Sequence, residues 1–173
     1  TIGANGVQTT LPINVDGTWS ISNSFSFQKD WKMANNRQVS IITSGSSSYN
    51  ESMVLINGIQ SDFTILNIRP SAELRINLND KIELNQAYSF VHLNSKYESP
   101  QFNSQSLTFH DSRSEIVYRL AQRLVWETSL DYCYNANNVP GLLKSYYKWN
   151  PAVTYIFLKG RKGELKFAVN DIL

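Results

Sequence analysis

Few side chains in this sequence are of the types that perform catalysis or bind metals. His92 and His110 are the only histidines, and no cysteine, carboxylate or other histidine lies at a spacing that would complete a metal site around either. Asp111 follows His110 directly, but consecutive strand residues point to opposite faces of a sheet, so this pair cannot act together. The lone Cys133 is predicted to be a free, unreactive thiol. Because no phosphate-binding loop or nucleophile elbow is present either, we predict no catalytic residue, cofactor or metal.

The charged residues offer a second kind of chemistry. Eight of them fall on the polar positions of segments that alternate between polar and apolar residues: Asp16, Arg69, Glu73, Arg75, Glu83, Arg123, Glu127 and Asp131. In a transporter such residues would line an aqueous passage and influence what passes through it. In any other sheet, neighbouring opposite charges would neutralise one another across strands.

The elements that position these residues are predicted to be β-strands. From Ile13 to Phe27 the odd positions are mainly apolar and the even ones polar, and the parity is reversed but equally regular from Leu66 to Leu78. Shorter runs of the same kind follow at 82–90, 124–134, 149–157 and 165–169. No window of ten residues prefers helical spacing. We therefore predict an all-β chain with seven strands and the beginning of an eighth.

Composition narrows the class of protein. The chain has 173 residues, of which 17% are charged, against roughly 25% in soluble proteins, while 42% are hydrophobic. Its 21 serines and 18 asparagines supply most of the remaining polarity. No apolar run is long enough for a membrane-spanning helix, and the net charge of +2 is spread without a basic stripe, so we expect no nucleic-acid partner.

The connections alternate between short and long. Short turns are predicted at 34–36, 79–80, near 121–122 and at 160–163, with longer polar stretches at 44–61, 94–106 and 135–145. Strands of roughly 15 residues exceed the usual 5 to 6. Long strands with short turns at one end and long loops at the other are typical of an antiparallel, up-and-down transmembrane β-barrel in an outer membrane.

Aromatic residues agree with this interpretation, because they gather near both ends of the predicted strands as two interfacial girdles. The predicted lipid-facing or girdle residues are Trp19, Phe25, Phe27, Trp31, Tyr88, Phe90, Trp126, Tyr132, Trp149, Tyr155 and Phe157. The eight charged residues above would then face the lumen. The alternative is a soluble β-sandwich binding module whose aromatic residues fill a core.

Two local details are also predicted. Phe63 and Ile65 have the opposite parity to Leu66, which indicates a β-bulge near Ile65. The turn around Asn79 and Asp80 must hold an odd number of residues. If it is Leu78 to Asp80, Arg75 faces Glu83 directly, and if it is Asn79 to Lys81 the two are diagonal neighbours; either register gives a cross-strand ion pair.

The sequence resembles the barrel of TonB-dependent receptors and related outer-membrane proteins of Bacteroidetes-type bacteria. The likeness is strongest from Leu124 to Leu173, in Leu130-Asp131-Tyr132, Trp149-Asn150-Pro151 and the ending FLKGRKGELKFAVNDIL, with a further match at Ile68-Arg69-Pro70. It is a family-level likeness without a catalytic or cofactor motif.

The resemblance implies a multi-pass protein of the Gram-negative outer membrane that takes up a nutrient ligand. It implies lipid, a surface lipoprotein and a TonB-type energy complex as partners. Residues 1–173 would then be about eight consecutive strands of a larger barrel, without its plug domain, signal peptide and last strand. The remaining strands would come from further chain or another subunit, because an open sheet edge is not tolerated in lipid. A complete eight-stranded barrel and a non-transporting scaffold or secretion component are the alternatives.

Overall fold

The computed structural model describes residues 17–56, 58–121, 123–137, 143–158 and 163–172. Eight strands are present, as the alternation predicted, and the last has only six residues. Their bounds are β1 (Trp19–Met33), β2 (Arg37–Ile56), β3 (Ile59–Leu78), β4 (Ile82–Tyr97), β5 (Gln105–Ala121), β6 (Leu124–Asn135), β7 (Ser145–Phe157) and β8 (Gly163–Ala168). The described residues contain no α-helix, only a single 3-10 turn at Asn79–Lys81.

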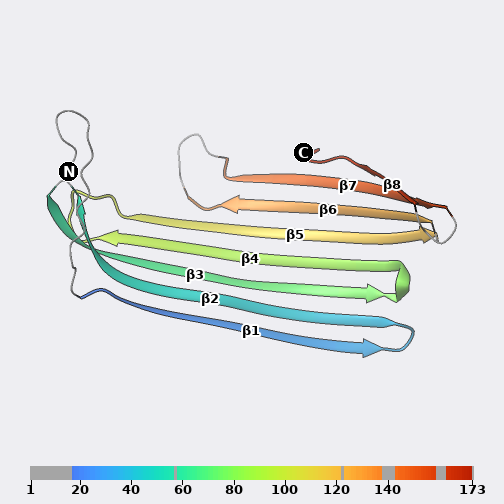
Figure 1. The fold of residues 1–173 in the computed structure, drawn as a ribbon, viewed down its shortest axis with the longest axis horizontal. Coiled ribbons are helices and arrows are strands. Elements are labelled where there is room, and N and C mark those ends of the chain that lie inside the picture. The colour runs from blue at the N-terminus through green and yellow to red at the C-terminus, as the bar shows by residue number, and fades with distance from the viewer. Residues whose placement is uncertain (1–16, 57, 122, 138–142, 159–162, 173) are drawn as a thin grey trace.

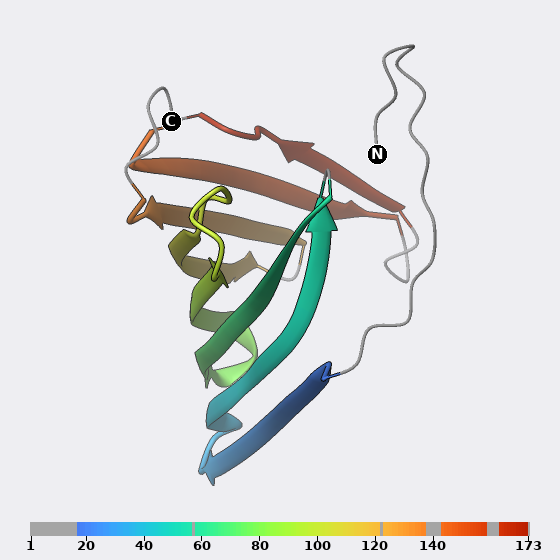
Figure 2. The same cartoon turned by 90° about the vertical axis from the view of Figure 1, so that its left-hand side faces the viewer.

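All eight strands form one antiparallel sheet in which each strand pairs with its neighbour in sequence (Figure 1). The sheet curls strongly, so that one face is concave and the other convex (Figure 2). Among the described residues β1 pairs only with β2 and β8 only with β7, which leaves two free edges. The all-β, up-and-down architecture is confirmed, and these eight strands do not close on themselves.

The short turns lie together at one end of the sheet, on the right of Figure 1, as predicted. Asn35, Asn36 and Asn79 adopt positive φ angles of 61°, 54° and 63° there. Asparagine tolerates this left-handed region better than most residues, which explains why asparagines occupy these tight connections. No helix in the part of the chain that the structure describes is long and apolar enough to cross a membrane.

The predicted long loop at 44–61 is wrong. Residues 44–56 continue β2, and 59–61 begin β3, so that two strands of 20 residues meet in a tight turn at Gly58, whose φ is 80°. The strand was missed because both of its faces are polar over this stretch: Ser44, Ser46 and Ser48 alternate with Gly45 and Ser47. Two-sided polarity removes the hydrophobic alternation that identifies a strand.

The predicted bulge near Ile65 is also wrong. Pairing between β2 and β3 runs without a shift through Phe63, Ile65 and Leu66. Phe63 and Ile65 therefore lie on the otherwise polar face, where Phe63 stacks on Tyr97 with ring centroids 4.5 Å apart. The one register shift within the described pairs lies between Arg119 and Ala121.

The sheet is a single layer without a packed core. Ala152 is the only buried hydrophobic residue among those described, while large side chains such as Ile21, Phe25 and Phe167 are 63%, 57% and 76% exposed. A soluble domain buries such side chains between two layers. The fold therefore presents most of its large apolar residues outward, on one face.

Gly45 lies beneath an aromatic ring on this apolar face. A Cβ at this position would lie 2.6 Å from Phe25 Cε1 and 3.3 Å from Pro70 Cα, because the ring covers the glycine as in other aromatic–glycine pairs of sheets. We expect Gly45→Ala to displace the ring and lower the free energy of unfolding by about 1 kcal/mol. With Phe25 already replaced by alanine, the same substitution should be neutral or stabilising, because glycine weakens strands. Chemical unfolding of the wild type, the two single variants and the double variant measures the coupling between Gly45 and Phe25. Additive effects of the two substitutions would contradict the contact.

Candidate functional site

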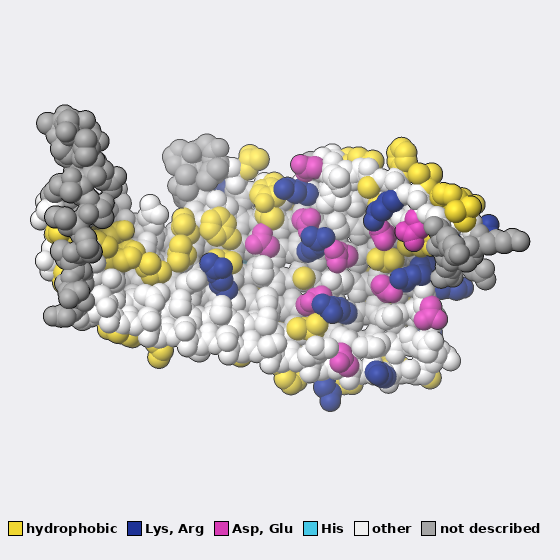
Figure 3. Space-filling model, in the orientation of Figure 1, with side chains coloured by type: hydrophobic (Ala, Val, Ile, Leu, Met, Phe, Trp, Pro, Cys, Tyr) yellow, Lys and Arg dark blue, Asp and Glu magenta, His cyan; other side chains and the backbone are white. Residues whose placement is uncertain are grey.

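The strand pairing assigns alternate side chains to two faces, which we call the convex face and the concave face. The convex face carries all eleven predicted lipid-facing or girdle residues: Trp19, Phe25, Phe27, Trp31, Tyr88, Phe90, Trp126, Tyr132, Trp149, Tyr155 and Phe157. The concave face carries most of the charge and faces the viewer in Figure 3. The sequence therefore predicted correctly which of these side chains share a face.

Polar side chains on the convex face are paired with one another. Gln86 donates to Ser112 Oγ over 3.0 Å and accepts from Ser114, and the indole of Trp149 donates to Thr128 Oγ1 over 2.8 Å. Three further pairs on this face are Ser47 with Asn23, Tyr88 with His110 and His92 with Thr108. Side-chain pairs of this kind satisfy the hydrogen-bonding groups within the sheet.

The predicted lumen-facing residues largely share the concave face. Six of them lie on it: Arg69, Glu73, Arg75, Glu83, Glu127 and Asp131. Arg123 lies in the turn before β6 instead, and Asp16 lies outside the described residues. The acidic and basic side chains gather toward the half of the concave face nearer the short turns (Figure 3).

The predicted ion pair between Arg75 and Glu83 does not form. The turn is Asn79–Lys81 and Leu78 pairs with Ile82, so the two residues are only diagonal neighbours. Arg75 instead binds Glu73 two residues back on the same strand at 2.6 Å, and Glu83 binds Arg119 across β4 and β5 at 2.8 Å. The parity of the sequence correctly placed these charges on one face. It could not predict whether Arg75 would pair with an acidic residue of its own strand or with one of the neighbouring strand.

Further ion pairs continue across the concave face. Arg113 contacts Glu115 at 2.7 Å and Asp131 at 3.7 Å, and Lys166 pairs with Glu127. Acidic and basic groups thus alternate from β3 to β8 and largely neutralise one another. The concave face accordingly carries mixed charge rather than a field of one sign.

Removal of Arg113 should have a small, salt-dependent effect. Its side chain is 55% exposed, and exposed ion pairs contribute less than about 1 kcal/mol. We expect Arg113→Gln to lower the free energy of unfolding by that amount at low salt and by almost nothing at about 1 M salt, where screening acts within about 3 Å. Denaturant titrations at the two salt concentrations test this. Arg69→Gln is the matched control, because Arg69 donates to Asn67 and forms no ion pair with a described residue. A large loss at both salt concentrations would contradict the assignment.

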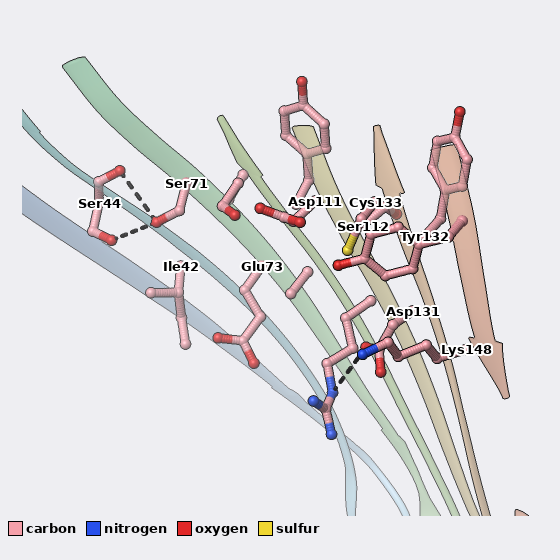
Figure 4. Close-up of a pocket in the computed structure, with 16 residues that line it drawn as sticks. Ile42, Ser44, Ser71, Glu73, Asp111, Ser112, Asp131, Tyr132, Cys133 and Lys148 are labelled. Carbon is pink, nitrogen blue, oxygen red and sulfur yellow. Dashed lines mark hydrogen bonds and ion pairs between the residues drawn. The ribbon is translucent and has the colours of Figure 1, made fainter. Parts of the chain in front are cut away.

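The concave face carries a hollow of about 470 Å³ that crosses from β2 to β7 (Figure 4). Ser44 and Ser71, whose hydroxyls are 2.8 Å apart, lie on one side of it, and Asp111, Cys133 and Lys148 lie toward the other. The hollow contains hydroxyl, carboxylate, thiol and ammonium groups from six strands. It suits a hydrated polar solute or the surface of another protein segment, and it has no arrangement of nucleophile, base and oxyanion donors.

Sequence reasoning missed an apolar cluster near the long loops, on the concave face. It consists of Phe63, Ile65, Val91, Leu93, Leu107 and Phe109, which neighbour one another through the pairing of β3, β4 and β5. The signal was present in the odd-numbered apolar residues of these strands, but Phe63 and Ile65 were explained by a bulge. The concave face is therefore polar near the short turns and partly apolar near the long loops.

The residues singled out for chemistry are divided between the two faces of the sheet. His92 and His110 are on the convex face, whereas Asp111 and Cys133 are on the concave face, as the strand geometry predicted. The described part of the chain holds no group of three or more metal-binding side chains.

Comparison with known proteins identifies no relative: no family model matches the sequence, and no curated protein or solved structure matches it.

Proposed function

We propose that this chain forms part of the wall of a transmembrane β-barrel in a Gram-negative outer membrane, with its convex face against lipid and its concave face lining an aqueous lumen. The observation that carries the proposal is the single-layer sheet: all but one of its described apolar residues remain unburied, and they lie mainly on one face. A β-sandwich would need a second sheet over that face. The eight described strands form only one.

The length of the apolar face supports a membrane span. The apolar window of a strand is the segment over which its convex side chains are mainly apolar. On β6 this window extends over eleven residues, from Leu124 to Tyr134, and on β7 it extends over eleven residues, from Tyr147 to Phe157. A tilted strand needs about 9 to 11 residues to cross the hydrocarbon layer. Because Leu124 pairs with Tyr155, the second window is shifted by two residues toward the short turns, as strand tilt requires.

The polar pairs of the convex face support the same environment. In water, Gln86, Thr128 and His92 would gain little from protein partners, because solvent satisfies them. In lipid each of them needs a partner within the sheet. All three have one.

The two free edges indicate that further strands complete the barrel. β1 presents 15 residues, none of them proline, to an edge that no described strand pairs with. The strand that pairs with β1 must run antiparallel to it, while the partner protein keeps its long loops on the same side of the membrane. A second copy inserted in the same direction would present its β1 parallel to this β1, so β1 of a second copy is excluded. A strand that runs in the direction of β8 meets both conditions. The remainder of the barrel or another subunit would supply it.

Uptake of a nutrient ligand, with a plug, a surface lipoprotein and a TonB-type energy complex, is the activity that we propose for the complete barrel. It rests on the sequence resemblance and is compatible with a concave face of mixed, internally paired charge. A non-transporting scaffold or secretion component would use the same wall. A plug domain encoded in the same gene would favour uptake, and a gene without one would contradict TonB-dependent transport.

Membrane fractionation of the full-length protein tests the proposal. We expect the protein in the outer-membrane fraction, resistant to alkaline carbonate and released only by detergent, because its apolar face is in contact with lipid. Recovery in the aqueous fraction without detergent would overturn the proposal and favour the soluble alternative.

A further inference from the structure

Both histidines of the chain occupy the same narrow region of the convex face, at the end of the apolar windows nearer the long loops. His92 pairs with Thr108, and His110, two residues further along β5, pairs with Phe90 on one side and Tyr134 on the other. Positions like these in an outer-membrane barrel face the headgroups of the outer leaflet, where aromatic residues are usual. Two imidazoles at this depth require an explanation that a simple girdle does not give.

Each imidazole has one nitrogen engaged by a neighbouring hydroxyl. Tyr88 Oη lies 2.7 Å from His110 Nδ1, and Thr108 Oγ1 lies 2.9 Å from His92 Nδ1. When the hydroxyl donates, Nδ1 is the acceptor and the proton of the neutral ring is on Nε2. Both histidines then offer an N–H donor without needing a charge, and protonation of the rings would strengthen that donor.

The surrounding charge favours an anion. On the convex face of β4, β5 and β6 the described residues include no aspartate or glutamate, and the exposed Lys96 lies on the same face two positions beyond Asn94. The nearest acidic residues on this side are Asp62 on β3 and Glu98, which follows β4; both lie beyond the histidines, toward the long loops. Asp111 belongs to the concave face.

The aromatic setting favours a lipid over a free ion. The ring of Phe90 lies between the two histidines, with centroids 6.4 Å from His92 and 5.1 Å from His110. Tyr134 lies on the other side of His110 at 5.7 Å. An anion held here has apolar rings around it that can contact acyl chains, which a small hydrated ion would not use.

We propose that His92 and His110 form a binding site for the phosphate group of an outer-leaflet lipid. This inference rests on the proposed membrane function. The two imidazole N–H groups would be the donors to the phosphate, and the flanking aromatic rings would contact the lipid chains. Lys96, four residues beyond His92 on β4, would attract the anion from a distance.

Retention of lipid by the full-length protein in detergent tests the site. The probes are phosphatidic acid and the matching diacylglycerol, and native mass spectrometry counts the lipid that remains bound. His92→Phe together with His110→Phe keeps the aromatic character of the surface but removes both donors. We expect about tenfold less bound phosphatidic acid, because hydrogen bonds to a charged group are lost, and unchanged binding of diacylglycerol.

The control is Lys29→Gln together with Arg37→Gln, which removes two basic residues from the convex face near the short turns. We expect it to retain phosphatidic acid normally. An equal loss in this control would mean general charge attraction and would overturn the site, as would full retention by the histidine variant. Displacement of the lipid by inorganic phosphate would overturn the lipid assignment. These lipid-binding measurements use protein that has already been extracted from membranes, so a negative result would reject the lipid site but not the proposed membrane function. Recovery of the protein in the aqueous fraction would reject both.

Discussion

Leu130→Arg is expected to lower the free energy of unfolding in a bilayer by about 2 to 4 kcal/mol. Leu130 lies near the middle of the apolar window of β6, on the convex face, with 38% of its surface exposed. A guanidinium group there must either enter hydrocarbon or distort the bilayer to reach water. A reversible denaturant titration of protein refolded into lipid vesicles measures the loss.

Ser129→Arg is the matched control, because Ser129 is the preceding residue of the same strand and lies on the concave face. It pairs with Glu115 and Asn150. An arginine there gains a carboxylate neighbour and remains in water, so we expect a change of less than about 1 kcal/mol. Equal losses at the two positions would contradict the assignment of the faces.

Removing the hydroxyls that satisfy Gln86 should also be costly. We expect Ser112→Ala with Ser114→Ala to lower the free energy of unfolding in lipid by about 1 to 3 kcal/mol, because the Gln86 amide is left without its side-chain partners. Replacing Gln86 with leucine in the same variant should recover most of the loss, since no unpaired amide remains. The same titration in lipid vesicles measures both steps.

This rescue experiment distinguishes whether lipid or water surrounds the convex face. In water the unpaired amide would be hydrated, and the two serine substitutions would change stability by no more than about 0.5 kcal/mol, as for other surface sites. A small loss without rescue would therefore contradict contact of Gln86 with lipid.

The sequence predicted the strands wherever one face is apolar and the other polar. β1, the second half of β3 and β6 follow this rule, and the faces of their aromatic residues were correct. It failed between Ser44 and Ser61, where serine and asparagine occupy both faces and the alternation disappears. Backbone pairing with β1 and β3, rather than hydrophobic pattern, maintains the strand there.

The details of the candidate site were less predictable, because they depend on choices among near-equal neighbours. Arg75 had Glu73 and Glu83 within reach, and only the turn length and side-chain geometry decide between them. His92 and His110 are 18 positions apart, and their proximity follows from the register of β4 with β5. The apolar cluster that includes Phe63 and Phe109 on the concave face could not be predicted. It forms only because β3 has no bulge near Ile65, and the parity of the sequence does not show whether a bulge is present.

Cysteine labelling along β6 shows whether the two faces of this sheet meet different solvents. Cys133 is first replaced by serine, and single cysteines are introduced in the full-length protein from Val125 to Tyr132, then treated in intact membranes with a membrane-impermeant maleimide. With water on the concave face and lipid on the convex face, we expect labelling at the concave positions Val125, Glu127, Ser129 and Asp131. The convex positions Trp126, Thr128, Leu130 and Tyr132 should be protected. Labelling without a period of two, or stronger labelling at the even-numbered positions, would contradict this assignment of the two faces.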